Sequence, residues 1–316
     1  MNFLCFYNLF FYIVNAATFL FSKTPIHIQH QHQHQHQHQH QHQHNLNKIG
    51  HLNSNSENQC VISLDKQPYI CEDNNLEIPK YSNKKLITYS PGGLKGFYFI
   101  GIATFINERY DLTNYLYSGA SAGSWTALFM SYKYNSTELL HYLLGSEEII
   151  EAKTITTLEY NMKKRLLNRY TAEDFHFNKL FISITPFQLP ISSNIYYKFQ
   201  TLEEAIDCCI ASSHIPFITG GLFNKYKNIY ALDGGLHDKP YLLRNIKPTL
   251  HISMDMFPNN SYISQLGFFE RFIEFFSFSK NNLMELFIKG YTDAQKNVDF
   301  LDSVFLYTNT DTDLRI

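Results

Sequence analysis

The stretch YSGASAGSWTA, residues 117–127, includes five small residues in a row, Gly119 to Gly123, between Tyr117 and the only tryptophan of the chain, Trp125. It follows a short β-type run, TNYLYS, and precedes an apolar, helix-like segment. A G-x-S-x-G pattern between a strand and a helix is typical of a turn too tight for side chains at the glycine positions. We therefore predict that Gly119 and Gly123 flank an exposed nucleophile, Ser121. The helix N-terminus at this point favours developing negative charge.

Segments with strand-like and helix-like patterns alternate along the chain. The β-type runs lie at 84–90, 113–118, 179–187, 228–235 and 249–256, the fourth of them running into a turn. The helical patterns lie at 97–108, 122–134, 138–168 and 201–213. This alternation implies a mainly parallel sheet covered on both faces, an α/β fold with three α/β/α layers. The first helical pattern is apolar almost all round, which predicts a buried helix.

The composition bounds the class of protein. The 316 residues are 44% hydrophobic and 16% aromatic, enough to bury a sizeable core. A formal net charge of −2 gives no electrostatic reason to expect a nucleic-acid partner. Cys208 and Cys209 fall in a helical pattern and are predicted to be buried core thiols. Cys60 and Cys71 are the plausible disulfide pair if the chain enters an oxidising compartment.

The first 81 residues differ in amino-acid composition from the rest of the chain. Residues 1–22 carry no charged side chain, which predicts a signal peptide or an uncleaved signal anchor, and thus a membrane-associated protein on the secretory or endomembrane route. Residues 23–81 form a polar linker whose alternating His and Gln offer no apolar surface for a core. The imidazoles would suit zinc or copper, although simple repeat expansion is the favoured explanation. Residues 82–316 are assigned to one globular domain.

A second glycine-rich stretch, PGGLKG at 91–96, precedes the buried helix. Gly92, Gly93 and Gly96 let consecutive amides point into one concavity at a helix N-terminus, which suits an oxyanion or a phosphate. This stretch lacks both the G-x-G-x-x-G spacing of a dinucleotide site and the G-K-S/T of a P-loop. Lys95 either orients the loop or faces solvent.

A carboxylate that can act as a base lies at the end of the fourth β-type run. The stretch YALDGG places two glycines after Asp233, which keeps the approach to the carboxylate open. Alone, Asp-Gly-Gly is more often an ordinary turn. His214 and His237 are candidates for a histidine-based triad, and each is more simply explained as a neighbouring or exposed histidine.

In this order, PGGLKG, GASAG and DGG resemble the three signature motifs of the patatin-like phospholipase family. The stretch ASSHIPF also resembles the small-residue segment that leads to Ile-Pro in that family, and the resemblance covers about residues 84–245. It implies that Ser121 is the nucleophile and Asp233 its base, in a Ser–Asp dyad without histidine. It also implies an oxyanion loop formed by Gly92, Gly93, Leu94, Lys95 and Gly96.

The activity implied by this resemblance is hydrolysis of fatty-acyl esters of phospholipids or acylglycerols through an acyl-enzyme. No metal or cofactor takes part in the dyad chemistry. Pro91 stands where the family often has another glycine, and Lys239 where an Asn is common. Because Pro91 removes one N–H donor, a lipid-binding relative without turnover is an alternative. Acyl transfer to an acceptor other than water is another.

One further segment, LGFFERFIEFFSF at 266–278, carries an apolar stripe with helical spacing. Its members are Leu266, Phe269, Ile273 and Phe276, widened by Phe268, Phe272 and Phe275. Core packing explains such a stripe. The sharper hypothesis is that it docks on a membrane or lipid surface, because a lipase must reach substrate inside an aggregate.

Overall fold

The chain divides into two units, Met1–Asn58 and Gln59–Ile316, and every described residue belongs to the second unit. The computed structural model describes residues 61–63, 81, 83–188, 192–243, 246–257, 270, 274–279 and 281–306. The predicted N-terminal leader, the His/Gln repeat and both members of the Cys60–Cys71 pair lie outside these ranges. So do all members of the 266–278 stripe except Phe275 and Phe276.

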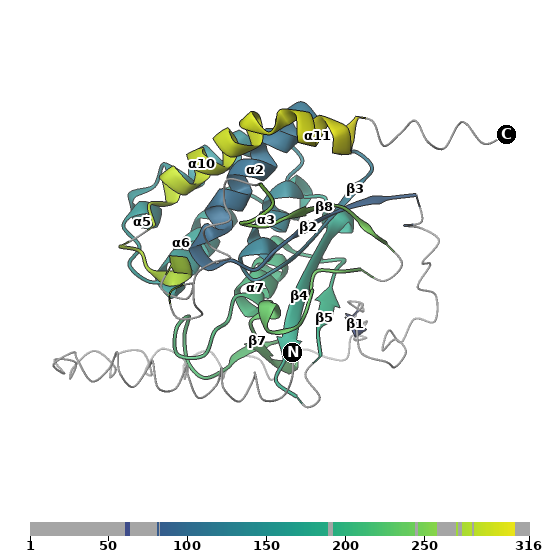
Figure 1. Cartoon of the computed structure of the whole chain (residues 1–316). Coiled ribbons are helices and arrows are strands. Elements are labelled where there is room, and N and C mark those ends of the chain that lie inside the picture. The colour runs from purple at the N-terminus through teal and green to yellow at the C-terminus, as the bar shows by residue number, and fades with distance from the viewer. Residues whose placement is uncertain are drawn as a thin grey trace. The chain divides into compact units, whose positions relative to one another are not determined.

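The described strands form one sheet with the order β1-β5-β4-β3-β2-β8, to which a β6–β7 hairpin is added through β4 (Figure 1). Their bounds are Val61–Ser63 (β1), Lys85–Tyr89 (β2), Tyr115–Ala120 (β3), Leu180–Pro186 (β4), Asn194–Tyr196 (β5), Asn224–Tyr226 (β6), Ile229–Leu232 (β7) and Pro248–Ile252 (β8). The central strands β8, β2, β3 and β4 run parallel to one another. Pairs that involve β1, β5, β6 or β7 are antiparallel. The predicted mainly parallel sheet is thus present at the centre.

The described α-helices are α2 (Gly96–Arg109), α3 (Ala122–Met130), α4 (Ser136–Leu144), α5 (Glu147–Ile150), α6 (Ile155–Arg169), α7 (Leu202–Ser212), α10 (Leu283–Lys296) and α11 (Val298–Phe305). The helical pattern predicted over 138–168 is divided among α4, α5 and α6, because Gly145 ends α4 and Thr154 caps α6 through a bond from the Thr157 amide. Cys208 and Cys209 are buried in α7 as free thiols, as predicted.

The two faces of the sheet pack differently. Ile87 and Tyr117 pair across β2 and β3, and both belong to the large core cluster to which every described α-helix contributes. Leu86 and Leu116 pair one position earlier and belong to a small cluster completed by strand and loop side chains. This mixed α/β arrangement is compatible with an α/β/α sandwich. The described α-helices supply side chains to one face of the sheet, so the predicted coverage of both faces by helices stays a prediction.

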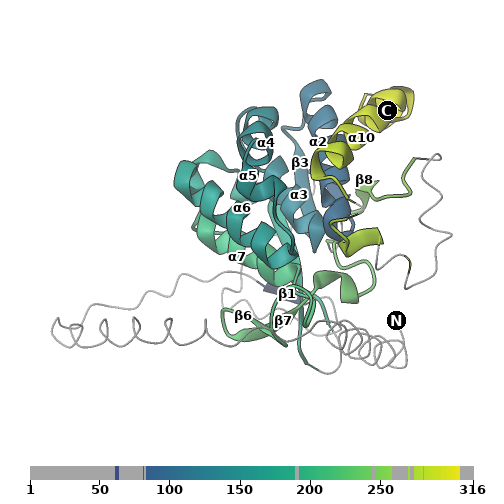
Figure 2. The same ribbon diagram turned by 90° about the vertical axis from the view of Figure 1, so that its left-hand side faces the viewer.

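Helix α2 is buried from Gly96 to Ile106, as its uniformly apolar sequence predicts, because it packs against α10 and α3 within the large core cluster. Figure 2 shows α2 and α10 side by side. Glycines allow this close approach: a Cβ at Gly101 would overlap the carbonyl oxygen of Phe287, and a Cβ at Gly290 would overlap that of Tyr98. Small residues at a helix crossing bring the two backbones together in this way.

We predict that Gly290→Ala lowers the free energy of unfolding by about 1–3 kcal/mol, because the new methyl group forces α10 away from α2. This loss exceeds the gain of up to about 1 kcal/mol in helix propensity. Chemical denaturation measures the difference. Gly221→Ala is the control, since no atom lies within 4 Å of the added Cβ. Equal stability of Gly290→Ala and the wild type would show that the two helices do not depend on this approach.

Candidate active site

Ser121 lies on a single-residue turn between β3, which ends at Ala120, and α3, which begins at Ala122. Its φ of 54° is in the left-handed region, which a residue with a side chain rarely adopts. A Cβ at Gly119 would overlap the backbone of Gly123, and a Cβ at Gly123 would overlap the carbonyl oxygen of Tyr89. The glycines are therefore required by the approach of three backbone segments, as the sequence motif predicts.

Hydrogen bonds from α7 and α3 hold this turn. The Ser121 amide donates to Ser212 Oγ at 2.8 Å, and Ser212 Oγ donates to the Ser183 carbonyl of β4 at 2.6 Å. The Ser124 hydroxyl donates to the Ser121 carbonyl at 2.6 Å. Sequence reasoning singled out the ASSHIPF segment only as a family feature, and the structure shows that its first serine supports the turn. Because the Ser121 amide is occupied, an oxyanion at this site needs other donors.

The structure brings Ser121 and Asp233 together. Asp233 follows β7, and its Oδ2 accepts a hydrogen bond from Ser121 Oγ at 2.6 Å. Its Oδ1 accepts one from the Gly235 amide at 2.7 Å, while its own amide donates to the His214 carbonyl at 2.7 Å. Both carboxylate oxygens and the backbone of Asp233 are thereby fixed. Ser121 is 4% exposed, so its hydroxyl faces a pocket rather than the open solvent that the sequence predicted.

Burial raises the pKa of Asp233 from 3.8 to about 6, while the hydrogen bonds from Ser121 and Gly235 oppose the increase. A carboxylate with a raised pKa is a stronger base and is still ionised for the most part at neutral pH. The short bond from the Ser121 hydroxyl is the kind that an ionised acceptor forms. The pair is thus arranged for transfer of the serine proton to the aspartate.

The glycine-rich loop forms a 3₁₀ turn, Gly93–Lys95, beside the start of α3. Its first internal bond runs from the Lys95 amide to the Gly92 carbonyl at 3.0 Å, so the amides of Gly93 and Leu94 are not used within the turn. Gly93 has φ +54°, and a Cβ there would lie 2.6 Å from the Phe275 carbonyl. A Cβ at Gly96 would lie 3.0 Å from Ala122 Cβ, which brings the loop next to the serine turn.

Lys95 is buried and orients this loop, one of the two alternatives that the sequence left open. Its Nζ lies 2.9 Å from Glu274 Oε1, and the two side chains are 7% and 17% exposed. Separating the two groups would leave a charge without a partner in a region of low exposure, which is strongly unfavourable. The ion pair therefore holds Lys95, and with it the loop, in position.

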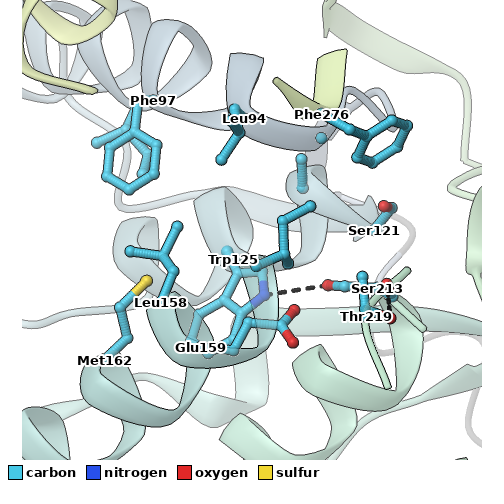
Figure 3. Close-up of a pocket in the computed structure, with 15 residues that line it drawn as sticks. Leu94, Phe97, Ser121, Trp125, Leu158, Glu159, Met162, Ser213, Thr219 and Phe276 are labelled. Atoms are coloured by element: carbon cyan, nitrogen blue, oxygen red, sulfur yellow. Dashed lines mark hydrogen bonds between the residues drawn. The ribbon is translucent and has the colours of Figure 1, made fainter. Parts of the chain in front are cut away.

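A pocket of about 60 Å³ opens beside Ser121, between the glycine-rich loop, α3 and α6 (Figure 3). Its apolar lining consists of Leu94, Phe97, Ile100, Ala122, Trp125, Ile155, Leu158, Met162 and Phe276, with Gly93 and Gly96 contributing backbone. Ser121, Glu159, Ser213 and Thr219 supply the polar lining groups. This lining favours an apolar group over a polar one next to the serine.

Neither candidate histidine replaces Asp233. His214 is buried, which lowers its pKa, and its Nδ1 lies 3.4 Å from Thr219 Oγ1. His237 is half-buried, and its Nδ1 contacts the Asp238 carbonyl at 2.8 Å. His214 instead serves the site through its backbone carbonyl. Sequence reasoning did not assign Glu159, Trp125 and Ser213 to a pocket, because they lie on three different helical segments and nothing in the linear sequence indicates that these segments meet.

Within the described ranges, no group of three or more His, Cys, Asp or Glu side chains could hold a metal ion. None of the helices that the structure describes is both long and apolar enough to cross a membrane. No protein-family model matches the chain, and no curated protein matches it significantly.

We predict that Asp233→Asn stabilises the fold in a pH-dependent way. The folded pKa of Asp233 is raised, so the wild type loses free energy of unfolding as the pH rises from 3.8 to about 6. The uncharged variant avoids this loss. The difference in free energy of unfolding between Asp233→Asn and the wild type therefore grows in favour of the variant by up to about 3 kcal/mol across that window. Denaturation at a series of pH values measures it.

The control is Asp111→Asn, since hydrogen bonds from Thr113 lower the pKa of Asp111. The Asp111 carboxylate stabilises the fold more as the pH rises, so Asp111→Asn becomes less stable relative to the wild type with increasing pH. An advantage of Asp233→Asn that stays constant between pH 3.8 and pH 6 would contradict the raised pKa of Asp233.

Proposed function

We propose that this chain is a patatin-like serine lipid acyl hydrolase that cleaves fatty-acyl esters of phospholipids or acylglycerols. The observation that carries the proposal is the 2.6 Å hydrogen bond from Ser121 Oγ to Asp233 Oδ2 at a strained turn. A structural serine has no need of a left-handed backbone, and a structural aspartate is more stable in a solvated position. The adjoining pocket and glycine-rich turn supply the two further parts that acyl transfer requires.

The proposed reaction has two halves. Ser121 Oγ attacks the ester carbonyl carbon while Asp233 takes the hydroxyl proton, and the amides of Gly93 and Leu94 stabilise the carbonyl oxygen as it becomes negative. The leaving alcohol accepts the proton from Asp233, and the acyl group remains on Ser121. Water then attacks the acyl-enzyme, again losing a proton to Asp233, and the fatty acid leaves with Ser121 reprotonated.

The apolar lining favours a hydrocarbon acyl group over a sugar or peptide substrate. Leu94, Phe97 and Phe276 lie on the loop side of the pocket, with Leu158 and Met162 opposite (Figure 3). Burial of each methylene contributes about 0.8 kcal/mol, so even a short stretch of acyl chain would add usefully to binding. A polar substrate would gain little from this lining.

We predict that Ser121→Ala lowers ester turnover by at least about 10³-fold and abolishes labelling by a fluorophosphonate, which reacts with activated serines. Asp233→Asn lowers both rates by about 10²–10⁴-fold, the usual range for a general base. Ser118→Ala, a change at a buried serine of the preceding strand β3, is the matched control and keeps turnover.

Fluorophosphonate labelling also separates the related possibilities. Robust hydrolysis by purified Ser121→Ala would overturn the assignment. Labelling at Ser121 without release of fatty acid from any lipid ester would indicate acyl transfer to another acceptor. Wild-type protein that binds lipid but is not labelled would be a relative without turnover.

A group of exposed, mostly aromatic side chains, here called the aromatic rim, supports the proposal that the protein acts on esters at a lipid surface. It consists of Phe187, Phe217, Leu222, Phe223 and Tyr230, which are between 36% and 57% exposed. The ring of Phe223 lies 4.7 Å from that of Phe187 and 5.3 Å from that of Tyr230. The segment that carries Phe217 and Leu222 also carries Thr219, which lines the pocket. Exposed apolar side chains that adjoin a lipid site are typical of membrane contact.

The two described members of the 266–278 stripe have a different position. Phe276 lines the pocket and the Phe275 carbonyl lies against Gly93, so both are half-buried beside the glycine-rich loop. For these two residues, packing against the site replaces the free lipid-facing surface that the sequence suggested.

We predict that the double variant Phe223→Ser/Tyr230→Ser binds phospholipid vesicles at least about tenfold more weakly, because it removes two aromatic side chains from the interface. Hydrolysis of a soluble short-chain ester is unchanged. The control is Ile150→Ser/Tyr160→Ser, which removes two side chains of similar exposure from α5 and α6. Equal vesicle partitioning of the two double variants would remove the aromatic rim from the proposal.

A further inference from the structure

Glu159 is a buried acid on the inward face of α6. It is 6% exposed and lies between Leu158 and Met162, which together with it line the pocket beside Ser121. The exposed carboxylates of the chain need no explanation, but a carboxyl group placed in an apolar pocket does. An apolar side chain of the same size would fill this position without desolvating a polar group.

The neighbours of Glu159 are polar but uncharged. Its carboxyl group lies beside the Trp125 indole and the Ser213 hydroxyl (Figure 3). Trp125 Nε1 donates to Ser213 Oγ at 3.1 Å, and Ser213 Oγ donates to the Cys209 carbonyl at 2.8 Å. Among the described residues, the charge that acts on Glu159 is the negative charge of Asp233.

These surroundings favour the neutral form of Glu159. Burial raises its pKa well above the ordinary value, and the charge of Asp233 raises it further, although Ser213 and Trp125 oppose the change. A protonated carboxyl group has an O–H donor in addition to its acceptor oxygens. The pocket therefore holds a group that can both donate and accept a hydrogen bond, surrounded by hydrocarbon.

We propose that Glu159 forms a polar subsite in the acyl pocket, which hydrogen-bonds an oxygen carried by the fatty-acyl chain and so selects hydroxylated or oxo-acyl esters. This inference rests on the proposed function. The ester carbonyl is not the partner, because Ser121 and the glycine-rich loop receive it on the other side of the pocket from Leu158, Glu159 and Met162 (Figure 3). An oxygen further along the chain would meet Glu159.

The consequence for specificity follows from the energetics of burial. A hydroxyl group that enters an apolar pocket without a partner is destabilised by the loss of its water, whereas a partner offsets that loss. With Glu159 present, an oxygenated chain binds at least as well as a plain one. With an apolar residue there, the oxygenated chain is penalised and the plain chain is favoured.

The test uses the purified full-length protein and two substitutions. Glu159→Leu removes the hydrogen-bonding group, whereas Glu159→Gln keeps a neutral donor and acceptor of the same length. Each protein hydrolyses a saturated acyl ester and otherwise identical esters that carry one hydroxyl group at successive carbons. At one position of the hydroxyl group, the ratio of kcat/KM for hydroxylated over plain ester should fall by about tenfold in Glu159→Leu and stay near the wild-type value in Glu159→Gln.

A binding measurement separates this inference from the proposed function. Trp125 is the only tryptophan of the chain and lines the pocket, so its fluorescence reports occupancy without turnover. The same esters are titrated into Ser121→Ala and into Ser121→Ala combined with each change at Glu159. A dependence of the binding ratio on Glu159 supports the subsite even if the wild type hydrolyses none of the esters, in which case only the proposed function fails.

Two outcomes would overturn the inference. Equal ratios in wild type and Glu159→Leu at every position of the hydroxyl group would show that the acid plays no part in selecting the acyl chain. An equal loss in Glu159→Gln and Glu159→Leu would show that the negative charge is required, as for recognition of a cationic head group. In both cases, turnover of the plain ester leaves the proposed function intact.

Discussion

The close approach of three backbone segments at the serine turn is the constraint on which the site depends. Strand β2 lies against the first turn of α3, and α3 folds back onto β3, so that Gly119 and Gly123 leave no room for a Cβ. Ser121 then takes a backbone conformation that costs roughly 1–3 kcal/mol, and the bonds to Ser212 and Ser124 hold it there. The strain is what presents the hydroxyl group to Asp233 and the pocket.

Desolvation gives the two acids of the site different roles. Asp233 accepts hydrogen bonds on both oxygens, which limits the rise in its pKa and leaves it able to exchange a proton near neutral pH. Glu159 is buried in the apolar pocket and is subject to the negative charge of Asp233, and both raise its pKa well above the ordinary value. The two acids therefore differ in environment, because Asp233 has a hydrogen-bond donor on each oxygen while burial favours the neutral form of Glu159.

The C-terminal part of the domain supports the site although its sequence motifs end near residue 235. Glu274 holds Lys95 of the glycine-rich loop, the Phe275 carbonyl lies against Gly93, and Phe276 closes the pocket. Helix α10 packs on α2, and α2 directly follows the glycine-rich loop. The position of the loop amides therefore depends on packing contacts that are distant in sequence, and damage to α10 is expected to reach the site through α2.

The sequence by itself predicted the central parallel strands and several of the helices, and it singled out Ser121 and Asp233, which the structure brings together. Short-range steric rules connect G-x-S-x-G to a tight turn, alternating patterns to a parallel sheet, and an all-apolar segment to the buried helix α2. The sequence did not predict α10, α11 or the antiparallel strands β1, β5 and β6, and β1 lies within the segment that was assigned to the linker. Short strands carry little periodic signal, and the partner of an amphipathic helix is not encoded in its own residues.

Only the tertiary structure decided how these groups act together. It placed Asp233 beside Ser121 across 112 positions of sequence, paired Lys95 with Glu274, and set Glu159 in the wall of the pocket. The structure also shows how these two acids differ from the exposed carboxylates. Burial and neighbouring charges determine a pKa, and both arise only when the chain has packed, so the raised pKa values of Asp233 and Glu159 could not be predicted from the linear sequence.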